Sequence, residues 1–592
     1  MNTDSPMYEW NEIPWRKLER NVYKLQQRIY KASRRGDVRT VRRLQKLLTK
    51  SWAAKCLAVR RVTQDNLGKK TAGVDGVKSL TPKQRLALVD KLTLSTKVAP
   101  TRRVWIPKLG KDEKRPLGIP TMYDRALQGL VKMTLEPEWE AKFEPNSYGF
   151  RPGRSCHDAI GAIFNAIRYK SKYVLDADIA KCFDKIDHER LLEKLNTYPT
   201  LRRQIRAWLK AGVMDGKELF PTSEGTPQGG VISPLLANIA LHGMEYRIKE
   251  LAEEFDIRDK KGHLISISSR RKSVTLIRYA DDFVIIHEDL TIVTRCREII
   301  SEWLKSMGLE IKPSKTRLVH TLHEFGDNKA GFDFLGFNIR QFKAGKYTSG
   351  KNPKGQLLGF STIITPSRES QIAHYTKIKE LIDKHRAQSQ ANLIKNLNQI
   401  IRGWCNYFSI GCPSKVFYRM DYLIYWKLRR WAKRRHPNKG EYWINRYWQK
   451  MGERNWVFAT RSEKGLFSLT EHGSIKAKTP AKVKGDASPY DGDLVYWSTR
   501  MGKHPEMPKR TASLLKMQKG KCAHCGLFFK DGDIIELDHI IPKSLGGKDE
   551  YKNWQLLHRH CHDEKSRGDG SYQAKSVIPE NYQWINDLLV MC

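Results

Sequence analysis

Acidic residues are scarce in this chain relative to basic ones. Its 592 residues include 107 Lys or Arg and only 64 Asp or Glu, a formal net charge of +43. Charge of one sign in this excess repels itself in a compact protein unless a polyanion neutralises it. The composition therefore favours a long nucleic-acid-binding surface over a merely solvated basic surface.

Long apolar runs and paired cysteines are also missing. No run approaches the roughly 20 apolar residues that cross a bilayer. The opening MNTDSPMYEW has acids and no apolar core, so we expect neither a signal nor a transit peptide. Seven of the ten cysteines are scattered singly, which is no disulfide framework and indicates a reducing compartment. We therefore expect a cytoplasmic protein that binds no membrane, in a cell where it can reach DNA.

The chain is too long for one hydrophobic core, and its composition changes along its length. We expect a basic helical extension (1–70), an α/β domain (71–365), a helical domain (366–435), a Trp-, Tyr- and Lys-rich segment (436–515) and a small metal-binding module (516–592). The helical domain includes an apolar stripe, from Leu393 to Phe408, that is typical of a packing face.

The first segment has the strongest charge bias. Residues 16–61 include sixteen Lys or Arg and two acids. Apolar residues recur at helical spacing before and after the turn SRRGD at 33–37. We expect a helical hairpin with one apolar seam and basic outer faces.

Two adjacent carboxylates lie in a short turn near the middle of the chain. The segment 279–282, Tyr-Ala-Asp-Asp, separates the apolar runs VTLIR and FVIIH, a pattern that predicts a β-hairpin. Upstream, residues 173–184 (YVLDADIAKCFD) predict a strand that leads into a helix. Nucleotidyl transfer uses two Mg²⁺ ions, and carboxylates at neighbouring strand ends supply the oxygen ligands that Mg²⁺ prefers. Because adjacent acids in a turn are often only solvated, this pair alone does not decide the function.

Further blocks surround the hairpin in a fixed order. They are RVWIPK (103–108) with KRPLGIP (114–120), NSYGFRPGRS (146–155), GTPQGGVISP (225–234), MGLEIKPSKT (307–316) and FLGF (334–337). With the two segments above, they resemble reverse transcriptases over residues 71–340. The resemblance implies an α+β multidomain protein built as a right-hand polymerase, with fingers and palm in 71–365 and a helical thumb in 366–435.

The resemblance also implies roles for single residues. The implied Mg²⁺-binding triad is Asp178, Asp281 and Asp282. Lys108 and Arg115 would grip the triphosphate of the incoming dNTP, since a point charge and a guanidinium fork both suit phosphate. Phe183 falls where an aromatic ring blocks a ribose 2′-hydroxyl, and Gln228 lies in the loop of the nucleotide pocket.

Two flanking motifs narrow the resemblance. They are AGVDG (72–76), before the fingers, and RGW with NYF (402–408), in the helical domain. They resemble group II intron proteins, which bind their own intron RNA, help it splice and copy it into DNA at a double-stranded DNA target. On this resemblance 366–435 is the thumb, or maturase, domain and 436–515 a DNA-binding domain. The intron RNA inserts into one DNA strand, and cleavage of the other supplies the primer.

The C-terminal segment contains a metal-ligand pattern. The pattern has two pairs of ligands, each pair separated by two intervening residues: Cys522 with Cys525, and His558 with Cys561. Four such soft or borderline ligands suit tetrahedral Zn²⁺. His560 could compete for the third position. A purely architectural zinc knuckle would leave the remaining polar residues of the segment without a purpose.

These remaining residues resemble the HNH nuclease family, in which a ββα-metal module encloses one catalytic divalent ion. The resemblance implies that His539 is the general base, that Asp538 and His562 bind Mg²⁺ or another divalent ion, and that Asn553 orients the base. Two other functions stay open: a splicing factor with a vestigial polymerase site, and a reverse transcriptase of a retron, diversity-generating or CRISPR-adaptation system.

Overall fold

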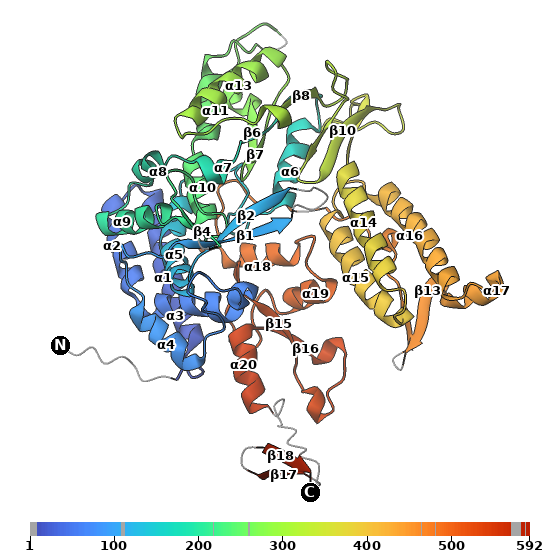
Figure 1. The fold of residues 1–592 in the computed structure, drawn as a ribbon. Helices are drawn as coiled ribbons and strands as arrows, with labels where there is room; N and C mark the ends of the chain where they lie inside the picture. The colour runs from blue at the N-terminus through green and yellow to red at the C-terminus, as the bar shows by residue number, and fades with distance from the viewer. Residues whose placement is uncertain are drawn as a thin grey trace. The chain divides into compact units, whose positions relative to one another are not determined.

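The computed structural model describes residues 9–107, 113–216, 218–258, 261–462, 465–479, 481–569, 582–585 and 588–591. The chain forms two compact units, Met1–Asp491 and Gly492–Cys592 (Figure 1). The boundary at Asp491 falls inside the segment 436–515. No helix of the described residues is long and apolar enough to cross a membrane.

The chain begins with three basic helices. They are α1 (Trp15–Arg34), α2 (Val38–Lys50) and α3 (Trp52–Arg60). Between α1 and α2, Gly36 takes a φ of +74°, which favours glycine, and the Asp37 side chain caps α2 by accepting from Thr40 N. Most apolar residues of α1 and α2 are buried, among them Leu18, Val22 and Leu44, while their Lys and Arg lie mostly outside. Val38 and Leu47 of α2 are exceptions, since about half of each side chain is exposed. The predicted hairpin with one apolar seam is therefore confirmed, except that Val38, at the start of α2, lies outside the seam.

The first unit contains a four-stranded antiparallel sheet, called the central sheet below. Its order is β6 (Thr275–Tyr279), β7 (Asp282–His287), β3 (Tyr173–Asp178) and β8 (Arg317–His320). The predicted hairpin at 279–282 and the strand before residue 184 are both present. Helices α13 (Leu290–Lys305) and α6 (Cys156–Ile167) contact this sheet. Because β3 and β7 are almost wholly buried, their polar ends are held in fixed positions.

A second sheet has the order β2 (Lys114–Ile119), β1 (Thr101–Pro107), β4 (Val213–Asp215) and β5 (Glu218–Phe220). Strands β1 and β2 form the antiparallel hairpin expected from RVWIPK and KRPLGIP. The remaining α-helices between residues 71 and 330 are α4 (Pro82–Lys91), α5 (Met122–Glu140), α7 (Cys182–Lys185), α8 (His188–Leu195), α9 (Pro199–Leu209), α10 (Ser233–Leu241), α11 (Met244–Glu254) and α12 (Ile267–Ser273).

A helical region follows the sheet of β9 (Phe332–Phe334), β10 (Phe337–Lys343) and β11 (Phe360–Pro366). It consists of α14 (Arg368–Lys384), α15 (Gln390–Tyr407) and α16 (Ser414–Arg435), followed by α17 (Glu441–Ile444). Strands β12 (Trp448–Met451), β13 (Arg454–Ser462) and β14 (Gly465–Ser468) form a small sheet, of which β13 and β14 contact α15. The buried residues Leu393, Leu397 and Ile401 confirm that the α15 stripe is a packing face.

The chain then returns to the main body of the first unit along residues 481–491. Val483 N donates to Asp158 Oδ1 (2.7 Å), Arg154 donates to the Gly485 carbonyl (2.7 Å) and Tyr490 Oη donates to Glu136 (2.8 Å). Part of the 436–515 segment is thus anchored on helices α5 and α6, far away in sequence.

The second unit is small. Helices α18 (Leu494–Gly502) and α19 (Lys509–Met517) precede the hairpin of β15 (Ile535–His539) and β16 (Trp554–His558), and α20 (Arg559–Gly568) follows it. Strands β17 (Tyr582–Ile585) and β18 (Leu588–Met591) pair with each other. The core consists of apolar side chains from α19 and β16 with Phe529, Cys522 and Cys561.

Candidate functional site

Three carboxylates lie at the turn that joins β6 to β7 and at the end of the neighbouring strand β3. In the sheet register Asp178, the last residue of β3, pairs with Asp282, the first residue of β7. Asp281 lies in the two-residue turn between β6 and β7, and Ile179 N donates to its carbonyl. Ala280, the other turn residue, has a φ of +58°, which is unfavourable for a non-glycine residue. The structure therefore brings together the three carboxylates that the sequence singled out.

A buried arginine fixes this turn. Arg278 is 1% exposed, and its guanidinium donates to Asn238 Oδ1 (3.0 Å), Ser147 Oγ (2.8 Å) and the Ala280 carbonyl (3.1 Å). Gly149 lies so close that a Cβ there would stand 2.3 Å from Ala280 N. The NSYGF block thus braces the carboxylate turn, and the sequence reasoning had assigned no role to Arg278 or Asn238.

The carboxylates repel one another in a site that is partly removed from water. Burial, and then the charges of Asp281 and Asp178, raise the pKa of Asp282 to about 7. Burial also raises the pKa of Asp281, with Asp178 adding to the shift and Lys315 and Arg115 opposing it. The Lys315 ammonium contacts Asp178 Oδ2 directly. The carboxylates thus attract the Lys315 ammonium and resist being ionised together. Such a cluster suits divalent metal ions, because their charge offsets the repulsion between the carboxylates.

The loop at 225–230 packs against the β1–β2 hairpin and α7. Gly118 N donates to the Gln228 carbonyl (2.5 Å), and a Cβ at Gly229 would stand 2.8 Å from the Gly118 carbonyl oxygen. Gln228 Nε2 reaches Asp184 Oδ1 (3.5 Å), and Thr226 N donates to the Phe183 carbonyl (2.5 Å). These hydrogen bonds therefore link the loop that contains Gln228 to helix α7, which contains Phe183 and follows the carboxylate Asp178 in the chain.

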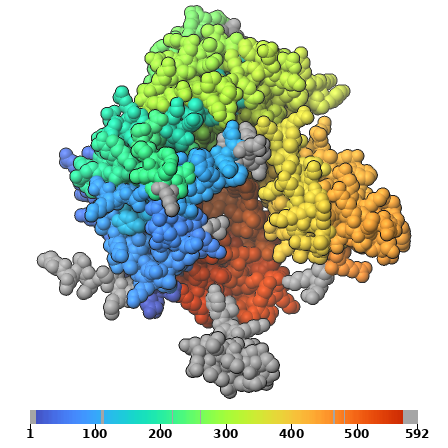
Figure 2. All heavy atoms as spheres, in the orientation of Figure 1, coloured from blue at the N-terminus to red at the C-terminus, as the bar shows by residue number. Residues whose placement is uncertain are grey.

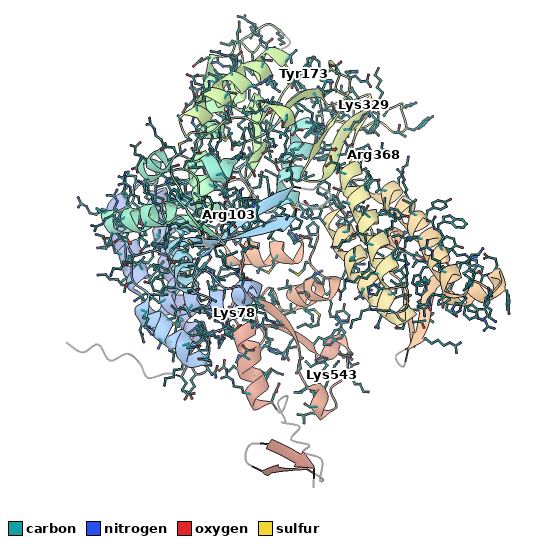
Figure 3. All side chains as sticks on the ribbon, in the orientation of Figure 1. Lys78, Arg103, Tyr173, Lys329, Arg368 and Lys543 are labelled. Atoms are coloured by element: carbon teal, nitrogen blue, oxygen red, sulfur yellow. The ribbon has the colours of Figure 1, made fainter. Side chains whose placement is uncertain are left out.

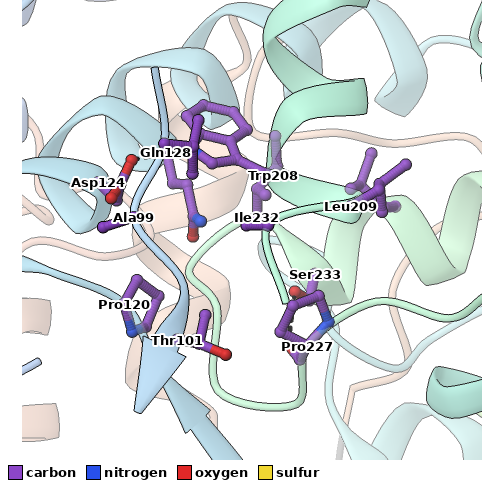
Figure 4. Close-up of a pocket in the computed structure, with 13 residues that line it drawn as sticks. Ala99, Thr101, Pro120, Asp124, Gln128, Trp208, Leu209, Pro227, Ile232 and Ser233 are labelled. Carbon is purple, nitrogen blue, oxygen red and sulfur yellow. Dashed lines mark hydrogen bonds between the residues drawn. The ribbon is translucent and has the colours of Figure 1, made fainter. Parts of the chain in front are cut away.

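A small cavity of about 10 Å³ lies beneath this loop. Thr101, Pro120, Asp124, Trp208 and Pro227 are among its lining residues (Figure 4). Asp124 accepts from Trp208 Nε1 (3.0 Å) and Thr121 Oγ1 (2.7 Å), and burial raises its pKa. The cavity is too small for a nucleotide, so these residues support the loop from below.

Two of the residues predicted to bind the nucleotide, Phe183 and Arg115, lie on α7 and β2. Phe183 is partly buried and meets Phe150 edge-on, with ring centroids 6.2 Å apart. Arg115 is exposed on β2, opposite Ile106. Lys108 lies outside the described residues. The prediction that Phe183 and Arg115 bind the nucleotide stays a prediction.

The second unit has a metal-ligand cluster. The ligand atoms of Cys522, Cys525, His558 and Cys561 all lie within 4.8 Å of one another. His558 Nδ1 faces Cys525 Sγ (3.3 Å), and its Nε2 lies 3.3 Å from the Asp533 carboxylate. A carboxylate on the second nitrogen is the usual support of a metal-binding histidine. Asp533 had no signal in the sequence pattern.

His560, the competing ligand of the sequence prediction, stacks on the ring of His558 with centroids 5.3 Å apart. It does not belong to the cluster of four. The donor set, three thiols and one imidazole, fits Zn²⁺.

The residues predicted for the nuclease site come from the β15–β16 hairpin and from helix α20, the same part of the chain that supplies His558 and Cys561. Asp538 Oδ1 is 3.6 Å from His562 Nε2, and its Oδ2 is 3.0 Å from the Lys565 ammonium. His539 Nε2 contacts Asp549 Oδ1 (2.8 Å) and Trp554 Nε1 (3.2 Å). The carboxylate and the imidazole predicted to share a divalent ion thus face each other, and Lys565 supplies a cation there.

Asn553 is 7% exposed and binds backbone only among its described contacts. Its Oδ1 accepts from Ile541 N (2.8 Å), and its Nδ2 donates to the carbonyls of Ile541 and Lys548 (3.0 Å each). These bonds fix the loop that follows His539. No hydrogen bond between the side chains of Asn553 and His539 is found among the described residues, and the prediction that Asn553 orients His539 stays a prediction.

Four family models match the chain. They are the N-terminal domain of reverse transcriptase (residues 10–92), reverse transcriptase, an RNA-dependent DNA polymerase (106–339), the group II intron maturase-specific domain (372–448) and HNH endonuclease (522–568).

Curated relatives agree with these matches. The chain is similar to the group II intron-encoded protein LtrA of Lactococcus lactis subsp. cremoris, with 28% identity over 540 residues, 78% of this chain and 85% of LtrA. It is also similar to protein YkfC of Escherichia coli K12, with 32% identity over 330 residues, 50% of this chain and 83% of YkfC.

Proposed function

The chain belongs to the group II intron-encoded proteins, with reverse transcriptase, maturase and HNH endonuclease domains, and from this premise we propose how its residues divide the work. Both enzymatic domains depend on divalent metal ions. The central sheet is the palm, the β1–β2 hairpin belongs to the fingers and α14–α16 form the thumb. We assign the five segments expected from the sequence, in chain order, to the N-terminal extension, the fingers and palm, the thumb or maturase domain, the DNA-binding domain and the HNH endonuclease domain.

Asp178, Asp281 and Asp282 hold Mg²⁺ at the polymerase site. The observation that supports this most strongly is the Asp178–Asp282 register pair beside the Asp281 turn. When bound, the metal supplies charge neutralisation and activation of the primer hydroxyl. The chain itself keeps the three carboxylates at one point, since Arg278 fixes the turn and Lys315 offsets part of their charge.

The residues around the triad bind and select the dNTP. Lys108 and Arg115 hold its phosphates, and Gln228 lies at its pocket. Thr226 N donates to the Phe183 carbonyl, which ties the backbone of Phe183 to the 225–230 loop. The Phe183 ring excludes a ribose 2′-hydroxyl by its volume.

The second unit cleaves DNA. Zn²⁺ is held by Cys522, Cys525, His558 and Cys561 and stabilises the module. Asp538 and His562 hold the catalytic ion, Mg²⁺ or another divalent ion, which when bound supplies charge neutralisation at the scissile phosphate. His539 accepts the proton of the attacking water, and Asn553 keeps the following loop in place.

The three activities combine in one mobility reaction. The protein forms a ribonucleoprotein with its intron RNA, and the RNA inserts into one strand of a double-stranded DNA target. The HNH domain nicks the other DNA strand, and the 3′-hydroxyl freed at the nick primes DNA synthesis. We place this reaction in the bacterial cytoplasm, at the nucleoid.

The polymerase assignment is tested by primer extension on an RNA template in Mg²⁺. Asp281→Asn should lower extension at least about a thousandfold, since the loss of a metal ligand removes several kcal/mol of transition-state stabilisation. Asp327→Asn, at an exposed aspartate of another loop, is the matched control and should extend normally. Extension by Asp281→Asn at the control's rate would show that the polymerase site lies elsewhere.

A further inference from the structure

Helix α16 presents an outward ridge of aromatic and basic side chains. Its buried residues, among them Phe417, Ile424 and Leu428, lie on the opposite side, and α16 contacts α14 and the 472–474 turn. Helices α14 to α16, labelled in Figure 1, lie at the surface in Figure 2, in yellow and orange. The ridge follows every fourth position, one row of side chains on a helix: Tyr418, Tyr422, Trp426, Arg430 and Arg434.

The aromatic rings on this ridge are unusually exposed. Tyr418 is 65%, Tyr422 63% and Trp426 48% exposed. Tyr422 and Trp426 meet edge-on, with centroids 6.3 Å apart and planes at 76°. They are therefore not stacked on each other. Trp426 also meets Tyr425 edge-on, with centroids 5.4 Å apart. An edge-to-face contact covers at most one face of one ring, so Tyr422 and Trp426 keep open faces. One exposed aromatic residue is ordinary, but neighbouring rings on one ridge mark an interaction surface.

The charge around the ridge is strongly positive. Helix α16 has eight Lys or Arg and one acid, Asp421, which accepts from His472 Nδ1 (2.8 Å) and Gly473 N (2.8 Å). Lys427 binds both oxygens of Asp383 (2.7 Å each). Among the described residues, Arg430 has no carboxylate within ion-pair distance. The ridge therefore favours an anionic partner.

A pocket of about 250 Å³ continues the ridge at its basic end. Its lining has five cationic side chains and a single carboxylate: Arg386, Lys427, Arg430, Arg434, Arg435 and Asp383. Asp383 is already engaged by Lys427. The pocket thus keeps a net positive charge, which suits a phosphate group, and has ample room for one.

We propose that this ridge binds unpaired nucleotides of RNA, with bases stacked on Tyr422 and Trp426 and a backbone phosphate in the pocket at Arg430. The inference rests on the proposed function, because it names a site at which the intron RNA is held. Bases within a duplex are stacked on their neighbours, so only a single-stranded loop or end offers free faces to the rings. An acidic protein would satisfy the arginines but gives no reason for open aromatic faces.

The test measures the affinity of the full-length protein for a 12-nucleotide single-stranded RNA and for the same sequence as a duplex. The Tyr422→Leu/Trp426→Leu double variant should lose roughly tenfold or more in affinity for the single strand, with little change for the duplex. Tyr422→Phe/Trp426→Phe keeps the rings and should restore most of the affinity. Tyr347→Leu, at a 95% exposed tyrosine on another loop, is the matched control.

Salt dependence separates the two kinds of contact. The leucine variants should leave the slope of log affinity against log salt unchanged, because stacking releases no counterions. Arg430→Gln should flatten that slope by about 0.7, the contribution of one phosphate contact on a single strand. Photo-crosslinking of a 4-thiouridine RNA to the wild-type protein should label a peptide of 418–430, which gives a result that no folding defect can imitate.

Equal single-strand affinity of the leucine variant and the Tyr347→Leu control would overturn the inference, as would crosslinks only outside 418–430. If the leucine variant instead loses self-association or a protein partner, the ridge is a protein interface and the inference is wrong. The proposed function fails separately, and only if the wild-type protein itself does not bind its intron RNA.

Discussion

Replacing Asp282 by asparagine should stabilise the metal-free protein while it destroys the polymerase. In the wild-type protein the pKa of Asp282 is about 7, against 3.8 for an unperturbed aspartate. Because this pKa is raised in the folded state, ionisation of Asp282 opposes folding. The penalty is absent below pH 3.8, grows as the pH rises and is complete above pH 7.

The size of the effect follows from the shift. A difference of about three pKa units corresponds to roughly 4 kcal/mol of unfolding free energy when the penalty is complete. The carboxylate keeps some contact with water, so screening reduces the expected gain of Asp282→Asn to about 1 to 3 kcal/mol at pH 8. At pH 5 only a fraction of this gain should appear. The melting temperature of the first unit should rise by a few degrees at pH 8.

The assay is thermal melting in a chelating buffer at pH 5, 6, 7 and 8. Asp327→Asn, which lies outside the cluster, serves as control and should show no pH-dependent difference from the wild type. Adding Mg²⁺ should stabilise the wild type more than Asp282→Asn, since a ligand stabilises the state that binds it. A difference between Asp282→Asn and wild type that is negative, or constant from pH 5 to 8, would refute the reasoning that the carboxylates repel one another.

Three further predictions concern other parts of the molecule. Phe183→Ala should lower discrimination against ribonucleotides by about tenfold or more, measured by single-nucleotide insertion of rNTP and dNTP; unchanged discrimination would make Phe183 a packing residue only. His558→Ala should lose bound zinc and unfold the second unit, whereas His560→Ala should keep its zinc by elemental analysis; the reverse result would exchange the two ligands. Neutralising Lys24, Arg28 and Lys31 together by glutamine should flatten the salt dependence of intron RNA binding by up to about two, and an unaltered slope would mean that α1 faces away from RNA.

The sequence predicted the elements that rest on short-range patterns. The apolar runs flanking 279–282 gave the β6–β7 hairpin, and the spacing of Leu18, Val22 and Ile29 gave the buried seam of α1. The Cys522 and Cys561 pairs gave a four-ligand cluster because a metal site constrains residue type and spacing together.

What the sequence could not predict depends on contacts between distant segments. Arg278 reaches Asn238 and Ser147, which lie 40 and 131 residues away along the chain. Asp533 supports His558 from a loop without any recognisable spacing. The anchoring of residues 481–491 on α5 and α6 likewise depends on single hydrogen bonds such as Tyr490 to Glu136. The spacing of residues along the sequence does not predict such contacts, because each joins one side chain to one partner in a distant segment.

The most direct test of the central claim follows both strands of a labelled DNA duplex exposed to the assembled ribonucleoprotein and dNTPs. The wild type should insert RNA into one strand, nick the other and extend the nick. Asp281→Ala should insert and nick but make no cDNA. His539→Ala should insert RNA, leave the second strand whole and make cDNA only from a supplied primer. Nick-primed cDNA from His539→Ala on an intact duplex, or from Asp281→Ala, would contradict the account.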